Sequence, residues 1–232
     1  MKEMFTNKIL TGLREAEFAR LMPLLQPVSL SAGERLSEPG EKARFIYFPE
    51  SSVLSCQAEM QDGKSAEVGM IGFEGMAGIT ALVGSSPAPH SLNVAVGGRA
   101  LRVSTDDFKR EILRGDGLQQ SLLAYAGEYV TQISQRSACA IFHIVEQRFA
   151  VWLLLLVDRI EEDEIHITQE RIAEYLGVRR AGVTVVAAAM QTAGAISYRR
   201  GNLRVNDRQM LEATACECYG TLAVGRPQAT YI

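Results

Sequence analysis

Arginine is concentrated in the last third of this chain, where its side chains could bind phosphate. Between Arg171 and Arg208 the 232-residue sequence has seven arginines, no lysine and two acidic residues. The local net charge is therefore +5 (7 − 2), although the formal net charge of the whole chain is −3. Guanidinium groups donate paired hydrogen bonds that match phosphate oxygens and guanine edges. This pattern predicts binding of double-stranded DNA.

Two predicted helices joined by a glycine turn position the first of these arginines. In the segment 168–190, Ile172 and Leu176 share one face of the first helix, Thr168 can cap it, and Gly177 can end it. The second helix begins near residue 179 and has an apolar stripe at Val183, Val186, Ala187 and Met190. In such a helix-turn-helix, the start of the second helix meets base edges. The expected DNA contacts are Thr168, Gln169, Arg179, Arg180, Ala181 and Thr184. The alternative is an ordinary helical hairpin with a solvated basic end.

The next arginines lie in a predicted β-hairpin after the second helix. In the segment 194–205, strand-like residues flank Gly201-Asn202, a favourable two-residue turn. Arg199 and Arg200 precede this turn and Arg204 follows it, so we expect all three to contact DNA phosphates. A helix-turn-helix followed by such a hairpin is a winged helix. The alternative is a solvated charged hairpin.

The first half of the chain predicts a small antiparallel β-barrel or jelly roll, because short strand-like runs alternate with turn signals. The predicted strands are 28–30, 35–37, 45–48, 53–60, 65–71, 91–96 and 99–104. Helices are predicted at 11–22, 73–83 and 106–113.

A long helix is predicted after the barrel. A stripe with heptad-like spacing runs along it and consists of Leu118, Leu122, Tyr125, Tyr129, Ile133, Arg136 and Ala140. We interpret this stripe as a homodimer seam, since palindromic DNA sites match two-fold symmetric proteins. The alternative is that the helix packs along its own barrel.

Four predicted elements connect the long helix to the winged helix. They are a hinge at 142–144, a buried helix at 144–160, an acidic loop at 161–164 and a strand at 165–167. The predicted domains are 1–115 for the effector-sensing barrel, 116–142 for the dimerisation helix and hinge, and 143–232 for the winged helix.

Composition and the absence of certain motifs argue against a membrane protein, a secreted protein and an enzyme. No apolar run reaches the roughly 18–20 residues of a membrane span, and the N-terminal segment lacks signal-peptide features. We therefore expect a cytoplasmic protein that does not enter a membrane. No phosphate loop, G-x-S-x-G motif or nucleophile–base pair is present, so we expect no catalytic residue and no enzyme.

The four cysteines, at positions 56, 139, 216 and 218, are too few and too unevenly spaced for a disulfide framework. Cys216 and Cys218 could bind a metal or sense redox state, but such a pair needs further ligands, and His143 and His166 are distant in sequence. We predict instead that both cysteines belong to one helix at 209–222, with one of them packed, and that no metal site exists. Cys56 and Cys139 are expected in core or seam positions.

Together these segments resemble the Crp/Fnr superfamily of bacterial transcription regulators over residues 25–208. The similarity is most specific in ITQERIAEYLGVRRAGVTVVAAAM and extends to IYFPESSVLS and DGKSAEVGMIGFEGMAG in the barrel. The resemblance implies an α+β protein with an N-terminal cyclic-nucleotide-binding-like β-barrel, a long dimerisation helix and a C-terminal winged helix-turn-helix. It also implies a homodimer that binds a palindromic DNA operator, responds to a small-molecule effector and acts on RNA polymerase.

This chain departs from the family pattern at both of the implied sites. Arg180 matches the recognition-helix arginine that contacts guanine, but Ala181, Gly182 and Val185 replace residues common in the family, so the preferred DNA sequence should differ. Residues 75–82 and 86–92 lack the glutamate and the arginine that hold a cyclic nucleotide, so cyclic AMP binding in the usual mode is not expected.

Other effectors and functions stay open. The iron–sulfur branch of the family needs cysteines near the N-terminus, and the first here is Cys56. His90 could bind haem, or it could be an ordinary histidine in a loop. The cofactor and the effector are therefore unknown. The competing functional hypothesis is an effector- or partner-binding module whose winged helix does not bind DNA.

Overall fold

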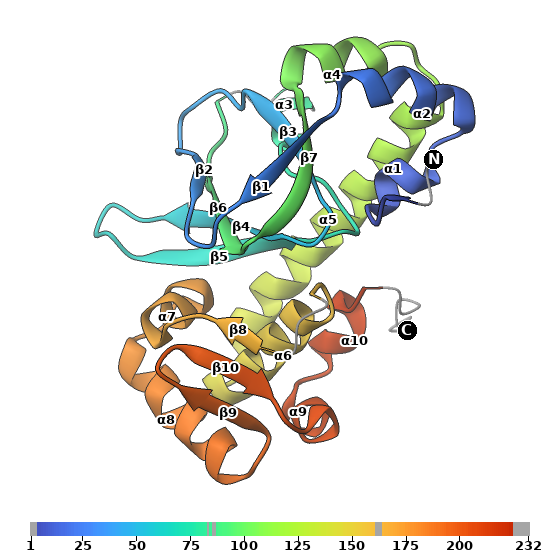
Figure 1. Ribbon diagram of the computed structural model, residues 1–232. Helices are drawn as coiled ribbons and strands as arrows, with labels where there is room; N and C mark the ends of the chain where they lie inside the picture. The colour runs from blue at the N-terminus through green and yellow to red at the C-terminus, as the bar shows by residue number, and fades with distance from the viewer. Residues whose placement is uncertain (1–3, 83, 85–86, 161–163, 225–232) are drawn as a thin grey trace. The chain divides into compact units, whose positions relative to one another are not determined.

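The computed structural model describes residues 4–82, 84, 87–160 and 164–224, which fall into two compact units (Figure 1). The first unit comprises Met1–Ala58 and Gly69–Thr131, and the second comprises Glu59–Val68 and Gln132–Ile232. The division at residues 131 and 132 falls inside the long helix α5(Gly117–Phe142), whereas the boundaries expected from the sequence lie at its two ends. In the part of the chain that the structure describes, no helix has the length and apolar character of a membrane span.

Antiparallel strands in the first half of the chain form two sheets, which confirms the barrel-like α+β prediction. One sheet has the order β1-β7-β3 and the other the order β2-β6-β4-β5. The strands are β1(Gln26–Leu30), β2(Arg35–Ser37), β3(Phe45–Pro49), β4(Val53–Glu59), β5(Ser65–Ile71), β6(Ser91–Val96) and β7(Gly98–Ser104). Strand β7 pairs with both β1 and β3 in antiparallel register, so it is the centre of the first sheet.

Two groups of apolar side chains form the core of the first unit. One group, which includes Leu54 and Val94, lies among the strands. The other joins the β1-β7-β3 sheet to the helices and includes Phe18, Phe48 and Phe108. Phe108 belongs to α4(Thr105–Ile112), and its ring meets Phe48 edge-on at a centroid distance of 5.5 Å. Burying each such ring contributes about 1.5–3 kcal/mol.

The single N-terminal helix predicted at 11–22 is wrong, because two separate caps divide this segment. The structure has α1(Lys8–Gly12), α2(Glu15–Leu21) and the 3₁₀ helix η2(Met22–Leu24). Asn7 accepts hydrogen bonds at the start of α1, and Leu13 is extended with its side chain buried. Glu17 then accepts a hydrogen bond from the backbone amide of Arg14 at 3.0 Å, at the start of α2.

The helix predicted at 73–83 is also too long, since only α3(Ile79–Leu82) is helical. Ala77 pairs with Tyr47 as an isolated β-bridge, and Gly78 has a φ of +102°. An added Cβ at Gly75 would lie 2.5 Å from the ring of Tyr125, so the chain approaches α5 where a side chain would not fit. Tertiary contacts therefore override the local helix pattern here.

The second unit contains the predicted winged helix. Its elements are α6(Val145–Val157), β8(Glu164–His166), α7(Gln169–Leu176), α8(Arg180–Thr192), β9(Ile196–Arg199), β10(Asn202–Val205), α9(Arg208–Thr214) and α10(Cys218–Leu222). The three strands form one antiparallel sheet of order β8-β10-β9. Helix α6 is buried along most of its length and packs against α7, α8 and α9. Residues 161–163 of the predicted acidic loop lie outside the described residues.

Helix α5 corrects the predicted dimer seam. Leu118, Leu122 and Tyr125 are buried in the core of the first unit, and the Tyr125 hydroxyl donates to the carbonyl of Met76 at 2.9 Å. The N-terminal part of the predicted stripe therefore packs on the helix's own barrel, which was the alternative interpretation. The outward face carries Leu123, which is 63% exposed.

Candidate nucleic-acid interface

The helix-turn-helix is formed by α7, α8 and the turn between them. The Thr168 hydroxyl accepts a hydrogen bond from the backbone amide of Arg171 at 3.2 Å and so caps α7. Gly177 ends α7 with a φ of +63°, in the left-handed region that glycine adopts without steric strain. Tyr175 stacks on Trp152 of α6 at a centroid distance of 5.7 Å. Both helices are thus anchored to the core of the unit.

The residues predicted from the sequence to contact DNA lie together on the surface. Eight are exposed and Gln169 is half-buried; the exposed ones are Thr168, Arg179, Arg180, Ala181, Thr184, Arg199, Arg200 and Arg204. The opposite face of α8 is buried through Val183, Ala187 and Met190. The apolar stripe therefore orients the polar face of α8 toward solvent, as the spacing indicates.

Hydrogen bonds organise the N-terminal end of α8. The Thr184 hydroxyl lies 2.7 Å from Gln169 Oε1 and 3.1 Å from the carbonyl oxygen of Arg180. Arg180 Nε lies 3.8 Å from Glu170 Oε2, and these two side chains are 66% and 63% exposed. Such an exposed pair is worth only about 0–1 kcal/mol, so Glu170 does not hold Arg180 away from a DNA ligand.

Val185 adds an exposed apolar side chain to this surface. It is 70% exposed on α8, one residue after Thr184. An exposed aliphatic side chain on a recognition helix can contact the methyl group of thymine. The spacing of apolar residues in the sequence already allowed Val185 to face outward near the start of this helix, and the structure places it there.

The wing is present, but its turn differs from the prediction by one residue. The turn residues are Arg200 and Gly201, with φ of +53° and +86°, and Asn202 already belongs to β10. Positive φ at both positions is typical of a type I′ hairpin turn. Asn202 instead pairs with Arg199 and His166, and its Oδ1 lies 2.7 Å from His166 Nδ1. These pairings set the register and place Arg200 at the tip.

The three wing arginines line one shallow hollow of the surface together with Glu164, Ser197, Asn202 and Asn206. The wing is fixed to α8 because the Gln191 side chain accepts a hydrogen bond from the Tyr198 amide at 2.8 Å. This hydrogen bond therefore joins α8 directly to the wing within this unit.

The barrel contains a buried polar cluster that the sequence analysis missed. Asn93 Nδ2 donates to Gln57 Oε1 at 3.0 Å and to Ser91 Oγ at 3.1 Å, and Arg35 Nε donates to Asn93 Oδ1 at 3.2 Å. Within the described residues, Ser55 Oγ and Gln57 Nε2 are buried without a hydrogen-bond partner. Since folded proteins rarely leave such atoms unpaired, this cluster is a candidate effector contact. The signal was the alternation of polar residues along β4 and β6.

The C-terminal cysteines also differ from the prediction. The helix expected at 209–222 is interrupted between α9 and α10, with Cys216 in the connection and Cys218 at the start of α10. Both side chains are buried, whereas only one was expected to be packed. Ala215 takes an extended conformation, which ends α9 and turns both cysteines toward the protein interior. Cys139 is buried, as expected, and Cys56 is half-buried.

Comparison with protein families identifies two domains in this chain. Residues 27–114 match the cyclic nucleotide-binding domain, and residues 147–214 match the Crp-like helix-turn-helix domain. Comparison with curated proteins gives no match.

Solved structures of similar fold include a protein from Eubacterium rectale named as a transcriptional regulator of the Crp/Fnr family, with a TM-score of 0.70 and 16% identity over 90% of this chain and 98% of that one. FixK2 from Bradyrhizobium japonicum has a TM-score of 0.69 and 14% identity over 83% of this chain and 98% of its own. The c-di-GMP-responsive global regulator CLP from Xanthomonas campestris has a TM-score of 0.68 and 16% identity over 84% and 100%, respectively. With both domains in the same order and the same fold, this chain belongs to the Crp/Fnr family of transcription regulators.

Proposed function

We propose that this protein binds a specific, palindromic DNA sequence as a homodimer and regulates transcription under the control of an effector bound to its barrel. The observation that carries this proposal is the surface formed by α8 and the wing. A recognition helix and an arginine-rich hairpin, fixed to each other by the Gln191–Tyr198 hydrogen bond, present their polar atoms on the outside of the unit.

The start of α8 supplies the sequence-specific contacts. Arg180 donates two hydrogen bonds to the O6 and N7 acceptors of a guanine, while Val185 contacts a thymine methyl group. Thr168 and Gln169 precede α8 in the chain and meet the sugar–phosphate backbone beside it. Because Ala181 and Val185 are short or apolar, fewer polar base contacts are made than by members with charged residues there.

The wing supplies contacts that do not depend on sequence. Arg199, Arg200 and Arg204 are exposed around the type I′ turn, where guanidinium groups can meet phosphate oxygens. These contacts position the protein on the duplex and make its affinity depend on salt concentration.

The exposed stripe of α5 supplies the homodimer contact. We define this stripe as Leu123, Gly127, Val130, Ser134, Ser137 and Ile141, all of them exposed and spaced alternately by four and three residues. Apolar and small residues at this heptad spacing form the seam of a two-stranded coiled coil. An added Cβ at Gly127 would meet no atom within 4 Å, so a partner helix can approach closely there. RNA polymerase is the expected partner of the DNA-bound dimer.

The effector is a small polar molecule. It is not a cyclic nucleotide bound in the mode usual for the family, in which an arginine of the barrel holds the phosphate. Residues 65–98 contain no lysine or arginine. The buried polar cluster around Gln57 and Asn93 offers amide and hydroxyl groups instead, with the Arg35 guanidinium bound to Asn93. A ligand that binds there raises the melting temperature of the protein by mass action, whereas cyclic AMP leaves it unchanged.

In vitro selection of DNA bound by the full-length protein, with and without candidate effectors, tests the proposal. The expected result is an enriched site with two inverted halves about one helical turn apart. Enrichment of an asymmetric site would contradict the homodimer. No enrichment at low salt under any condition would favour the alternative, a partner-binding module whose winged helix does not bind DNA.

A further inference from the structure

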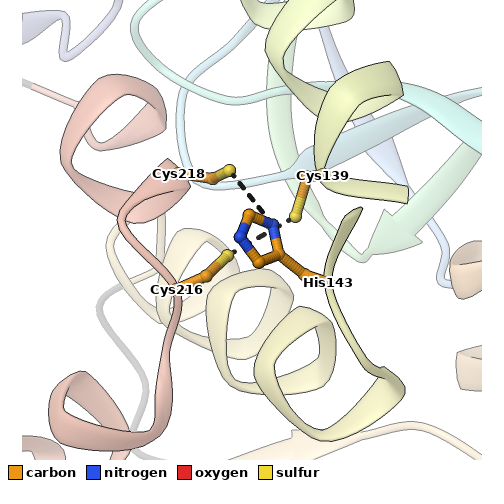
Figure 2. Close-up of side chains that lie close together, drawn as sticks. All are labelled: Cys139, His143, Cys216 and Cys218. Carbon is orange, nitrogen blue, oxygen red and sulfur yellow. Dashed lines mark hydrogen bonds between the residues drawn. The ribbon is translucent and has the colours of Figure 1, made fainter. Parts of the chain in front are cut away.

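Four side chains that commonly bind metals converge in the second unit. Cys139 lies near the end of α5, and His143 follows directly after that helix. Cys216 lies between α9 and α10, and Cys218 begins α10. One ligand atom from each of the four lies within 4.8 Å of all the others (Figure 2). The three cysteines are buried and His143 is half-buried.

The distances within the cluster match the size of a tetrahedral metal site. Cys139 Sγ lies 3.6 Å from Cys216 Sγ, and Cys218 Sγ lies 3.6 Å from His143 Nδ1. Zinc–sulfur bonds of about 2.3 Å and zinc–nitrogen bonds of about 2.0–2.1 Å place two tetrahedral ligands about 3.5–3.8 Å apart. The four atoms can therefore reach one common ion with small side-chain adjustments.

We propose that Cys139, His143, Cys216 and Cys218 bind a single zinc ion. Three sulfur ligands and one imidazole select a soft or borderline cation over magnesium or calcium, which prefer oxygen ligands. Four protein ligands complete the tetrahedral shell and leave no open position for a substrate, so the ion has a structural role.

The surroundings of the cluster suit this assignment. His143 presents Nδ1 to Cys218, and its other ring nitrogen, Nε2, lies 3.3 Å from Glu217 Oε1. A carboxylate that accepts the second ring N–H of a ligand histidine is a common feature of zinc sites, because it sets the tautomer and the ring orientation. Gln135 Nε2 donates to Cys218 Sγ at 3.1 Å, which stabilises negative charge on that sulfur.

The charge around the cluster also suits a bound cation. Three thiolates and one Zn²⁺ leave one net negative charge, and the half-buried Arg148 guanidinium interacts electrostatically with Cys139 and Cys216. Zinc binding releases the thiol protons to solvent, because the thiolate is the form that binds the metal.

The position of the ligands in the sequence suggests what the ion does. Two ligands precede residues 147–214, which match the helix-turn-helix domain, and two follow them. One ion thus joins both ends of the DNA-binding domain and closes a long loop, which stabilises the folded domain relative to the unfolded chain. The site does not depend on the proposed DNA contacts, since none of the four ligands belongs to α7, α8 or the wing.

Metal analysis of the purified full-length protein tests the assignment directly. We expect one zinc ion per chain, removal by a strong chelator, and a lower melting temperature of the stripped protein that zinc restores. Cobalt added to the stripped protein should produce the intense visible bands of tetrahedral Co²⁺ together with thiolate-to-cobalt charge transfer. Octahedral cobalt spectra, or the absence of any bound ion after reconstitution, would overturn the proposal.

Substitutions locate the site. Cys139→Ser, Cys216→Ser and Cys218→Ser should each abolish stoichiometric zinc binding, while Glu217→Gln should weaken affinity about 10–100-fold. Cys56→Ser is the matched control, because Cys56 lies on β4 in the other unit, and it should keep full zinc content. Equal zinc loss in Cys56→Ser would contradict the assignment.

Thiol chemistry on the wild-type protein keeps the test informative if a serine variant fails to fold. Zinc should protect three of the four thiols from alkylation, and removal of zinc should expose them. A contrary result would be an isolated protein whose mass is lower by two hydrogens and whose peptides contain a Cys139–Cys216 disulfide. It would show that these cysteines form a redox pair and not a zinc site. Acid-labile sulfide with iron would likewise overturn the zinc assignment.

Discussion

At the scale of single residues, Arg180 is the side chain that we propose as the main determinant of DNA sequence preference. Its guanidinium group is exposed and makes a long contact of 3.8 Å to Glu170. A DNA ligand can therefore replace Glu170 as its partner at little cost. Arg179 has the same charge but occupies the N-cap position, before the first helical residue of α8, so we assign it to a phosphate contact and not to a base.

Arg180→Ala should weaken binding to the selected site by about 1–3 kcal/mol and relax the preference at one base pair of each half-site. Arg180→Lys is the matched control, because it keeps the positive charge and loses the bidentate geometry. It should retain the affinity for unrelated DNA while losing much of the preference. Fluorescence anisotropy titrations with specific and scrambled duplexes at the same salt concentration measure both effects. Unchanged preference in both variants would exclude Arg180 as a base contact.

A second residue, Glu17, makes the stability of the barrel unit depend on pH. Its buried carboxylate accepts hydrogen bonds from Arg14 and from the Gly117 amide, at 2.8 Å for the latter, and so ties α2 to the start of α5. The Arg14 side chain lowers the pKa of Glu17 from 4.5 to about 2. The stabilisation is therefore complete above about pH 4.5 and is lost as the pH falls toward 2.

Glu17→Gln should lower the melting temperature at neutral pH, and the difference from wild type should shrink below about pH 4.5. Glu15→Gln, at an exposed position of the same helix, is the control and should have little effect. Thermal denaturation across this pH range measures both variants. A difference that stays constant with pH would show that the Glu17 carboxylate does not stabilise the fold through its charge.

At the scale of elements, the wing and the recognition helix should contribute different kinds of binding. In the proposed complex the wing contacts DNA phosphates through arginine side chains, so its contribution to binding depends on charge and not on DNA sequence. The proposed base contacts of the recognition helix depend on how α8 is oriented, and the buried residues of α8 and α6 fix that orientation. Salt dependence separates the two contributions.

Replacing Arg199, Arg200 and Arg204 together by alanine should weaken binding to all DNA sequences alike. The slope of log K against log salt concentration should become shallower by about 0.9 for each phosphate contact that is lost. A triple alanine variant of Arg44, Arg110 and Arg114, exposed on the barrel unit, controls for net charge. Equal salt slopes in wild type and the wing variant would rule out phosphate binding by the wing.

At the scale of the whole molecule, we propose that the two stripes of α5 have separate tasks, one in the core of the barrel unit and one in the dimer contact. Leu118, Leu122 and Tyr125 stabilise the barrel unit from within. The opposite stripe leaves Leu123, Val130 and Ile141 exposed by 63%, 63% and 75%. Large apolar side chains in a row on a surface indicate an interaction site, and a second copy of the same helix offers the matching heptad spacing.

Leu123→Glu combined with Val130→Glu should raise the dimer dissociation constant by about 100-fold or more, because carboxylates would face each other across the seam. Leu113→Glu is the matched control, since Leu113 is 83% exposed but lies outside α5. Analytical ultracentrifugation over a concentration series measures the constant. A double variant that dimerises like wild type would show that the dimer contact lies on another face.

Leu122→Ala should instead lower the free energy of unfolding of the barrel unit by about 2–5 kcal/mol, because Leu122 is buried in its core.

The sequence by itself determined the strands of the barrel, the helix-turn-helix, the hairpin and eight side chains now found exposed on these last two, but not how the helices at 11–22, 73–83 and 209–222 are shortened or divided. Helix spacing, the Thr168 cap and the Gly177 stop are local signals, and they act over a few residues. Tertiary structure decided what local signals leave open. Both stripes of α5 have helical spacing, and only packing on the barrel showed which one is buried. The pairing of Asn202 with Arg199 between β10 and β9 placed the wing turn at Arg200 and Gly201. The cluster of Cys139, His143, Cys216 and Cys218 joins residues on either side of an entire domain, and no local spacing encodes that approach because only the folded chain brings its ends together.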